Sequence, residues 1–137
     1  MTAASRRHRG RELALRVLFE LEGTAKDADE VLRYQADDIR ATPDMAAFAR
    51  GLVLGCLEHA DAIDSVIAEA SEHWALADLG KVERAVLRLG AFELLWGRDV
   101  PVAVVIDEAV ELAKAYTGED AAAFVNGVLG RVARQQV

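Results

Sequence analysis

The residues best suited to chemistry are arginines at the start of the chain. Five of them stand in the first 16 residues against one acid, Glu12: Arg6, Arg7, Arg9, Arg11 and Arg16. A guanidinium forms bidentate hydrogen bonds with phosphate and can stack on an unpaired base. Cations in the first turn of a helix also oppose its macrodipole, so helix stability does not explain them. The segment indicates either contact with nucleic acid or a solvated, partly disordered tail.

A second candidate group is a run of carboxylates at adjacent and i,i+4 positions: Asp107, Glu108 and Glu111. In an enzyme such groups could bind a metal or transfer protons. No histidine stands at ligand spacing with them, and the chain shows no nucleophile motif and no glycine-rich phosphate loop. We interpret the run as a solvated helix face, and we expect no enzyme activity, no metal site and no cofactor.

Asn126-Gly127 is a third candidate, because it interrupts a helical pattern where glycine costs about 1 kcal/mol relative to alanine. One interpretation is close helix packing at a position that tolerates no side chain. The other is backbone access for a ligand, with Phe124 exposed as a stacking platform for a base. The residues alone favour packing.

The elements that must position these residues are helices. The chain has 137 residues, 53% of them hydrophobic, with only two prolines and few aromatics, which favours one all-α domain over a sandwich or barrel. Cys56 is single, so we expect a small buried thiol and no disulfide. No apolar run approaches the roughly 20 residues that cross a bilayer, and no signal peptide is recognisable, so we expect a cytoplasmic protein without membrane contact.

Charge is distributed unevenly. The net charge of −7 argues against non-specific nucleic-acid binding. After the first 16 residues, however, the other 121 positions hold 11 basic and 22 acidic residues. The sequence therefore predicts a basic N-terminal arm, at about residues 1–11, on an acidic body.

Apolar spacing predicts the helices. The first runs from about Arg7 to Glu22, and a weaker pattern covers 31–39. Thr42 is expected to cap the next helix with Pro43 at its first position. Residues 44–70 fit two helices or one broken helix, 74–80 interrupt the period, and 82–97 resume it. The β-branched run 102–106 could be misread as a strand, but 109–116 indicate a helix, and a last helix follows with Asp120 as a plausible cap. No domain boundary is evident, so residues 1–137 are expected to form a single domain.

Three segments together carry a resemblance to the NusB family that covers essentially the whole chain. They are Arg6-Arg7-His8-Arg9-Gly10-Arg11-Glu12, then Val82-Glu83-Arg84-Ala85-Val86-Leu87-Arg88-Leu89 with Phe92-Glu93-Leu94-Leu95, and a C-terminal block. That block comprises Asp99-Val100-Pro101, Val105-Ile106-Asp107-Glu108-Ala109-Val110-Glu111-Leu112-Ala113-Lys114 and Phe124-Val125-Asn126-Gly127-Val128-Leu129.

The resemblance implies an all-α fold of about seven helices in two subbundles. It also implies a transcription antitermination factor that binds boxA RNA, a single-stranded element, together with the ribosomal protein NusE. Such factors act on ribosomal RNA operons within the RNA polymerase antitermination complex.

By matching position, the resemblance implies RNA contact at Arg6, Arg7, Arg9, Arg11, Asp120 and Phe124, and a NusE interface at Phe19 and Glu83. This chain departs from relatives in having Gly10 where alanine is frequent, which should loosen the first turn, and Phe19 where tyrosine is frequent. It also has alanines at 121–123 where relatives commonly carry Ser and Lys. The absence of this cation predicts weaker binding to RNA phosphates.

Other readings remain open from the sequence. A protein-interaction adaptor for NusE with little RNA affinity of its own is the main alternative. The same helical domain is also found at the N-terminus of ribosomal RNA cytosine methyltransferases, so fold does not settle function. No methyltransferase domain follows here, which favours the antitermination factor. Monomer and homodimer are equally compatible with the sequence.

Overall fold

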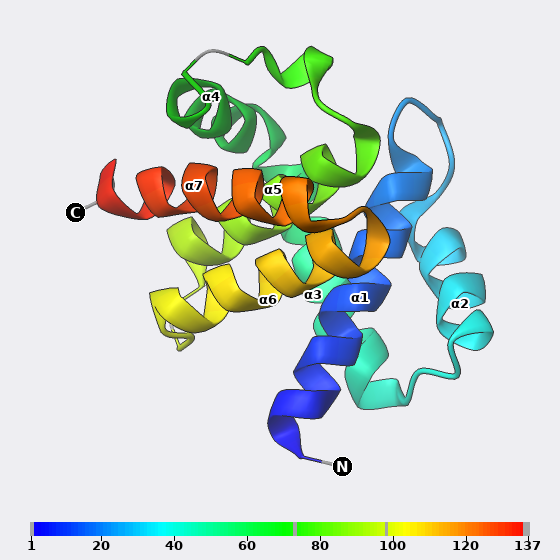
Figure 1. The fold of residues 1–137 in the computed structure, drawn as a ribbon. Helices are drawn as coiled ribbons and strands as arrows, with labels where there is room; N and C mark the ends of the chain where they lie inside the picture. Colours follow the sequence, from blue (N-terminus) through cyan, green and yellow to red (C-terminus); the bar gives the residue numbers. More distant parts are fainter. Residues whose placement is uncertain (1, 73, 98, 136–137) are drawn as a thin grey trace. The chain divides into compact units, whose positions relative to one another are not determined.

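The computed structural model describes residues 2–72, 74–97 and 99–135. This part of the chain forms seven α-helices and one 3-10 helix, with no strand (Figure 1). In chain order they are α1 (Ala3–Leu21), α2 (Ala28–Asp38), α3 (Pro43–Glu58), α4 (Ala60–Ala70), the 3-10 helix η1 (Leu76–Asp78), α5 (Lys81–Trp96), α6 (Val102–Tyr116) and α7 (Glu119–Gln135). The expected all-α fold of about seven helices is confirmed.

The helices group into two compact units, Met1–Glu58 with α1 to α3 and His59–Val137 with α4 to α7. In the first unit α1 packs against both α2 and α3, which also contact each other. Its core is apolar and lies on one face of each helix, as the spacing predicted. The side chains that are fully or almost fully buried include Leu13, Ala14, Val17, Val31 and Val53.

Helix α1 begins four residues before its predicted start. The side chain of Thr2 accepts a hydrogen bond from the backbone N–H of Ser5 at 3.0 Å, which satisfies one of the free donors at the helix end. The arginine-rich start is therefore helical, and the interpretation as a partly disordered tail is wrong. Thr42 caps α3 as predicted, since its Oγ1 accepts from the N–H of Met45 at 3.3 Å.

In the second unit α5 packs against α4, α6 and α7. Val86, Leu87 and Ala91 are completely buried on α5, which agrees with its wide apolar face. Gly90 lets α7 approach closely, because a β-carbon there would stand 2.6 Å from Leu129 Cδ1. The β-branched run after Pro101 forms the first turns of α6, so the helical interpretation of this segment is confirmed.

Two local predictions are resolved by the backbone. Residues 44–70 form two helices, because His59 leaves the helical conformation with φ −106° and ψ 21° between α3 and α4. Asp120 is not a cap. Helix α7 already begins at Glu119, and the N–H of Ala122 donates to the carbonyl of Gly118 at 3.1 Å, so Asp120 lies inside the first turn.

Two further expectations concern Cys56 and the membrane. The thiol of Cys56 is buried on α3, as expected. Among the described residues, no helix combines the length and the apolar character needed to span a bilayer.

Candidate nucleic-acid interface

The four predicted RNA-binding arginines of α1 have different surroundings. Arg6 and Arg7, in the first two turns, are exposed. Arg9 forms an ion pair with Glu12, and its second nitrogen donates to the carbonyl of Ile39 at 2.7 Å. Arg11 is only 4% exposed. Arg6 and Arg7 are thus placed to meet a ligand, whereas Arg9 and Arg11 also hold the helix in its unit.

Phe48 of α3 contacts several residues in this part of α1. The guanidinium carbons of Arg7 and Arg11 lie 5.7 Å and 5.3 Å from the centroid of its ring, within the range of cation–π attraction. Gly10 stands between the two arginines and is buried against the same ring. Sequence reasoning predicted a helix over this part of residues 44–70 and missed this role of Phe48. The available signal was that positions 7, 10 and 11 share one helix face.

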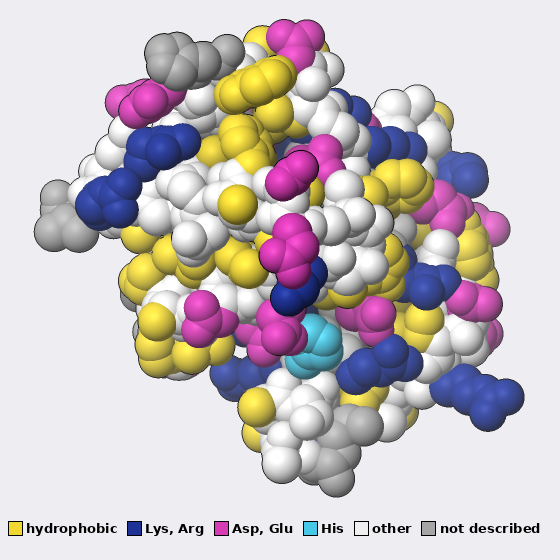
Figure 2. Space-filling view, in the orientation of Figure 1, with side chains coloured by type: hydrophobic (Ala, Val, Ile, Leu, Met, Phe, Trp, Pro, Cys, Tyr) yellow, Lys and Arg dark blue, Asp and Glu magenta, His cyan; other side chains and the backbone are white. Residues whose placement is uncertain are grey.

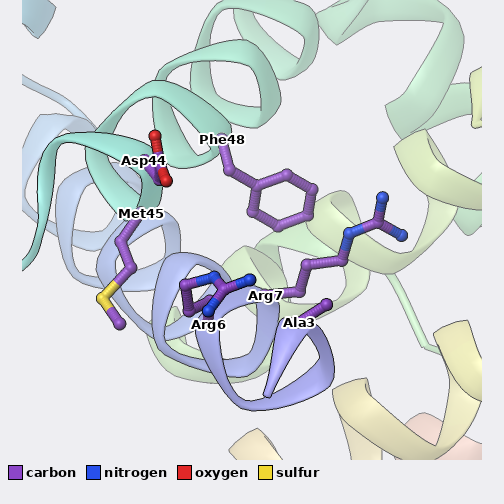
Figure 3. A pocket seen from close by; sticks show the side chains of 6 residues that line it. All are labelled: Ala3, Arg6, Arg7, Asp44, Met45 and Phe48. Carbon is purple, nitrogen blue, oxygen red and sulfur yellow. The ribbon is translucent and has the colours of Figure 1, made fainter. Parts of the chain in front are cut away.

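A pocket of about 200 Å³ opens between the first turns of α1 and α3 (Figure 3). Figure 3 shows the ring of Phe48 and the side chains of Arg6 and Arg7 around it. The pocket contains a flat aromatic surface, two cations and one carboxylate. Its lining residues are Ala3, Arg6, Arg7, Asp44, Met45 and Phe48.

The two predicted RNA contacts of the second unit lie on α7. Asp120 is exposed and Phe124 is half-buried. The ring of Phe124 meets Trp74 edge to face, with centroids 6.5 Å apart and planes at 82°. Trp74 is 54% exposed, which is unusual for so large an apolar surface. Sequence reasoning noted only that this stretch broke the helical period, so it missed Trp74 as a partner of Phe124.

Gly127 leaves room for a side chain. A β-carbon there would meet only the Arg131 guanidinium, at 3.7 Å, which is ordinary contact. The interpretation of Asn126-Gly127 as a close-packing site is therefore wrong. The other interpretation, backbone access for a ligand, stays a prediction.

The predicted NusE-contact residues belong to different units. Phe19 lies on α1 and is 40% exposed, while Glu83 lies in the first turn of α5 and is half-buried. The RNA candidates divide in the same way, with the arginines in the first unit and Asp120 and Phe124 in the second. Each unit therefore carries its own candidate surface.

Comparison with known proteins decides the family, because the chain matches the NusB family over residues 8–134. It belongs to the NusB family. The transcription antitermination protein NusB of Exiguobacterium is 41% identical over 130 residues, covering 95% of this chain and 98% of that protein. NusB of T. maritima has a TM-score of 0.86 at 37% identity, covering 94% and 91% of the two chains. A chain in the crystal structure of antitermination factors NusB and NusE in complex with dsRNA has a TM-score of 0.86 at 30% identity, covering 96% and 98%.

Membership in the NusB family also answers the question of catalysis. The relatives that match this chain over most of their length are transcription antitermination proteins, so the expectation that this chain is not an enzyme is confirmed. The carboxylates Asp107, Glu108 and Glu111 lie along α6, where two of the three are exposed. In the part of the chain that the structure describes, no cluster of three His, Cys, Asp or Glu side chains could hold a metal ion.

Charge differs between the two units of this NusB-family chain. Residues 1–58 hold nine Lys and Arg against ten Asp and Glu, whereas residues 59–137 hold seven against thirteen. Figure 2 shows Lys and Arg side chains spread over the surface of α1 and α2, among acidic ones. The acidic character of the chain is therefore concentrated in the second unit, and a polyanion meets less repulsion at the first.

Proposed function

We propose that this NusB-family chain is a cytoplasmic transcription antitermination factor that binds boxA RNA together with NusE. It acts on transcription of ribosomal RNA operons, within the RNA polymerase antitermination complex. Support comes from relatives that are transcription antitermination proteins, and from a solved relative whose crystal contains NusB, NusE and dsRNA.

The observation that carries the RNA-binding part is the pair of exposed arginines, Arg6 and Arg7, at the start of a capped helix. Each guanidinium presents a planar fork of donors that matches the oxygens of a phosphate. Neutralising phosphates releases counterions, so affinity must fall as salt rises. In this proposal Arg6 and Arg7 contact RNA directly, and Arg9 and Arg11 contribute mainly by holding α1 in place.

NusE binding is assigned to other residues. Phe19 offers an exposed aromatic surface on α1, and Glu83 offers a carboxylate on α5. Ribosomal proteins are generally basic, and the excess of acids in the second unit complements such a partner. The α7 residues Asp120 and Phe124 form a second proposed RNA surface within the second unit, with Phe124 as a stacking platform.

The test is fluorescence anisotropy of labelled boxA RNA, single-stranded and double-stranded, against a scrambled RNA. Each is titrated with the protein, with and without NusE, at two salt concentrations. Selective, salt-sensitive binding that NusE strengthens is the expected result. The variant Arg6→Ala with Arg7→Ala should weaken binding and make the salt dependence shallower by about one for each lost phosphate contact.

A matched control is available in the same unit. Arg33 and Arg40 are exposed and do not line the pocket between α1 and α3. Replacing both with alanine removes the same formal charge, so only the loss specific to the α1 arginines counts as recognition. Equal losses in the two variants would mean that the protein acts only through its overall charge.

The second candidate function is an adaptor that binds NusE and contacts RNA little. The first turn of α7 favours it, because Glu119 and Asp120 are exposed acids and Ala123 beside Phe124 provides no cation. Binding of NusE with no preference between boxA and scrambled RNA would select this function over the first.

A further inference from the structure

We propose that the pocket between α1 and α3 accepts one unstacked guanine base of the bound RNA. The base stacks beside the Phe48 ring and the Arg7 guanidinium, and the Asp44 carboxylate accepts hydrogen bonds from its Watson–Crick edge. The inference rests on RNA binding by α1 and adds a sequence-reading role to a surface otherwise assigned to phosphate contact.

The chemistry of the lining is the first argument. A site for phosphate alone is best built from cations and backbone N–H groups, since a carboxylate repels an anion. Here Asp44 lines the same pocket as Arg6 and Arg7. A carboxylate accepts hydrogen bonds and donates none when ionised, so it suits a base edge that carries donors. The mixture of two cations and one acid therefore fits a whole nucleotide, with the phosphate at the arginines and the base edge at Asp44.

The identity of the base follows from the number of donors. Guanine offers two adjacent donors on its Watson–Crick edge, N1–H and the N2 amino group, which match the two oxygens of one carboxylate. Cytosine and adenine each offer a single amino group there, and uracil offers one imino N–H. Bidentate pairing with a base edge discriminates strongly against the other bases. Asp44 therefore favours guanine.

The aromatic surface is the second argument. Unpaired RNA bases stack on aromatic rings and on arginine planes, and the pocket lining contains both, with Arg7 Cζ over the Phe48 ring at 5.7 Å from its centroid. The ring is held in place, because Gly10 packs against its Cδ2 edge and Arg11 lies 5.3 Å from its centroid. A surface that is already fixed loses little conformational entropy when a base binds. The pocket volume of about 200 Å³ corresponds to that of several water molecules, which a base would displace.

The test uses decauridine RNA that carries one central guanosine, inosine, adenosine or cytidine, with binding measured by fluorescence anisotropy. Inosine lacks only the N2 amino group, so it isolates the second hydrogen bond to Asp44. The protein should prefer guanosine to inosine by about fivefold or more. Asp44→Asn should remove this preference while the salt dependence stays unchanged, because Arg6 and Arg7 remain.

Asp37→Asn is the matched control, because Asp37 is an exposed acid of the same unit that does not line this pocket. It removes the same charge and should leave the guanosine preference intact.

Stacking in the pocket is measured separately, by the fluorescence of decauridine that carries a central 2-aminopurine. This fluorescence should fall when the protein binds and the base stacks. Phe48→Leu should reduce this fall in fluorescence. Circular dichroism checks that this variant remains folded.

The outcomes separate the inference from the function on which it rests. RNA binding that depends on Arg6 and Arg7 but treats guanosine and inosine alike overturns the inference and leaves the proposed function standing. A guanosine preference that survives Asp44→Asn also overturns it. Absence of any RNA binding overturns both.

Discussion

Gly10 of α1 lies directly against the ring of Phe48 of α3. A β-carbon on Gly10 would stand 2.6 Å from Phe48 Cδ2 and 3.3 Å from the carbonyl oxygen of Met45. The first distance is shorter than packed carbon atoms allow, so a side chain here must displace the ring. The same ring faces Arg7 and Arg11, and the glycine therefore positions the arginines as well as the two helices.

Gly10→Ala should destabilise the protein. Overpacking costs about 1 to 3 kcal/mol, and the higher helix propensity of alanine returns about 1 kcal/mol, so a net loss of about 1 kcal/mol is expected in urea unfolding. Adding Phe48→Leu should relieve the clash, so that Gly10→Ala costs less in that background. A cost that is the same in both backgrounds would show that Phe48 is not the obstacle.

Gly127→Ala should stabilise the protein, in contrast to Gly10→Ala. This glycine is also inside a helix, but a β-carbon there would meet only Arg131 at 3.7 Å. Alanine should therefore stabilise the protein by up to about 1 kcal/mol, measured in the same urea experiment. If RNA affinity falls while stability rises, the glycine serves ligand access. Destabilisation would contradict the room for a side chain at this position.

The ion pair between Arg88 of α5 and Asp64 of α4 should stabilise the second unit. Arg88 Nε lies 2.9 Å from Asp64 Oδ1, and a second nitrogen lies 3.2 Å from Oδ2. The two side chains are only 26% and 34% exposed. A double-mutant cycle with Arg88→Gln and Asp64→Asn should give a coupling of about 1 kcal/mol. The matched pair Arg50 and Asp29, about half exposed, should show a smaller coupling energy. A larger coupling energy for Arg50 and Asp29 than for Arg88 and Asp64 would contradict the role of burial.

Asp29 should titrate below its usual range. The hydrogen bond from Arg50 is the largest cause and lowers the pKa of Asp29; desolvation of the carboxyl opposes it, and the charges of Arg50 and Arg33 lower the pKa further. A lowered folded-state pKa stabilises the protein above the unfolded value of about 3.9, and this stabilisation is lost as pH falls through the folded pKa. NMR titration of the carboxyl carbon should show its pKa rising toward the usual value in Arg50→Gln. An unchanged pKa would contradict the contact.

Trp74 should report RNA at α7. Its exposed ring meets Phe124 edge to face, so a base that stacks on this pair should quench its fluorescence. Trp96 is stacked on His59, with centroids 4.1 Å apart, and provides an internal reference. Titration with boxA RNA should quench the protein, and Trp74→Phe should abolish the change. Equal quenching in that variant would place the RNA elsewhere.

Much of this molecule could be predicted from the sequence alone. The 3.6-residue spacing of Ala, Leu and Val predicted the helices, because each must bury one apolar stripe. Thr42-Pro43 predicted the start of α3 correctly, since a cap depends on neighbouring residues only. The boundaries were less accurate: α1 starts at Ala3 because Thr2 caps it, and α7 starts before Asp120.

Only the tertiary structure decided which candidate residues can meet a ligand. Arg7 and Arg11 share a residue type and a helix face, and both lie over the ring of Phe48, yet Arg7 is exposed and Arg11 is buried. Likewise, Trp74 and Phe124 are 50 positions apart in sequence and meet only in the folded second unit. The periodicity of one helix records which side is apolar. It carries no information about which distant side chain covers that side, so the sequence determined the helices and the family, and packing determined the surfaces.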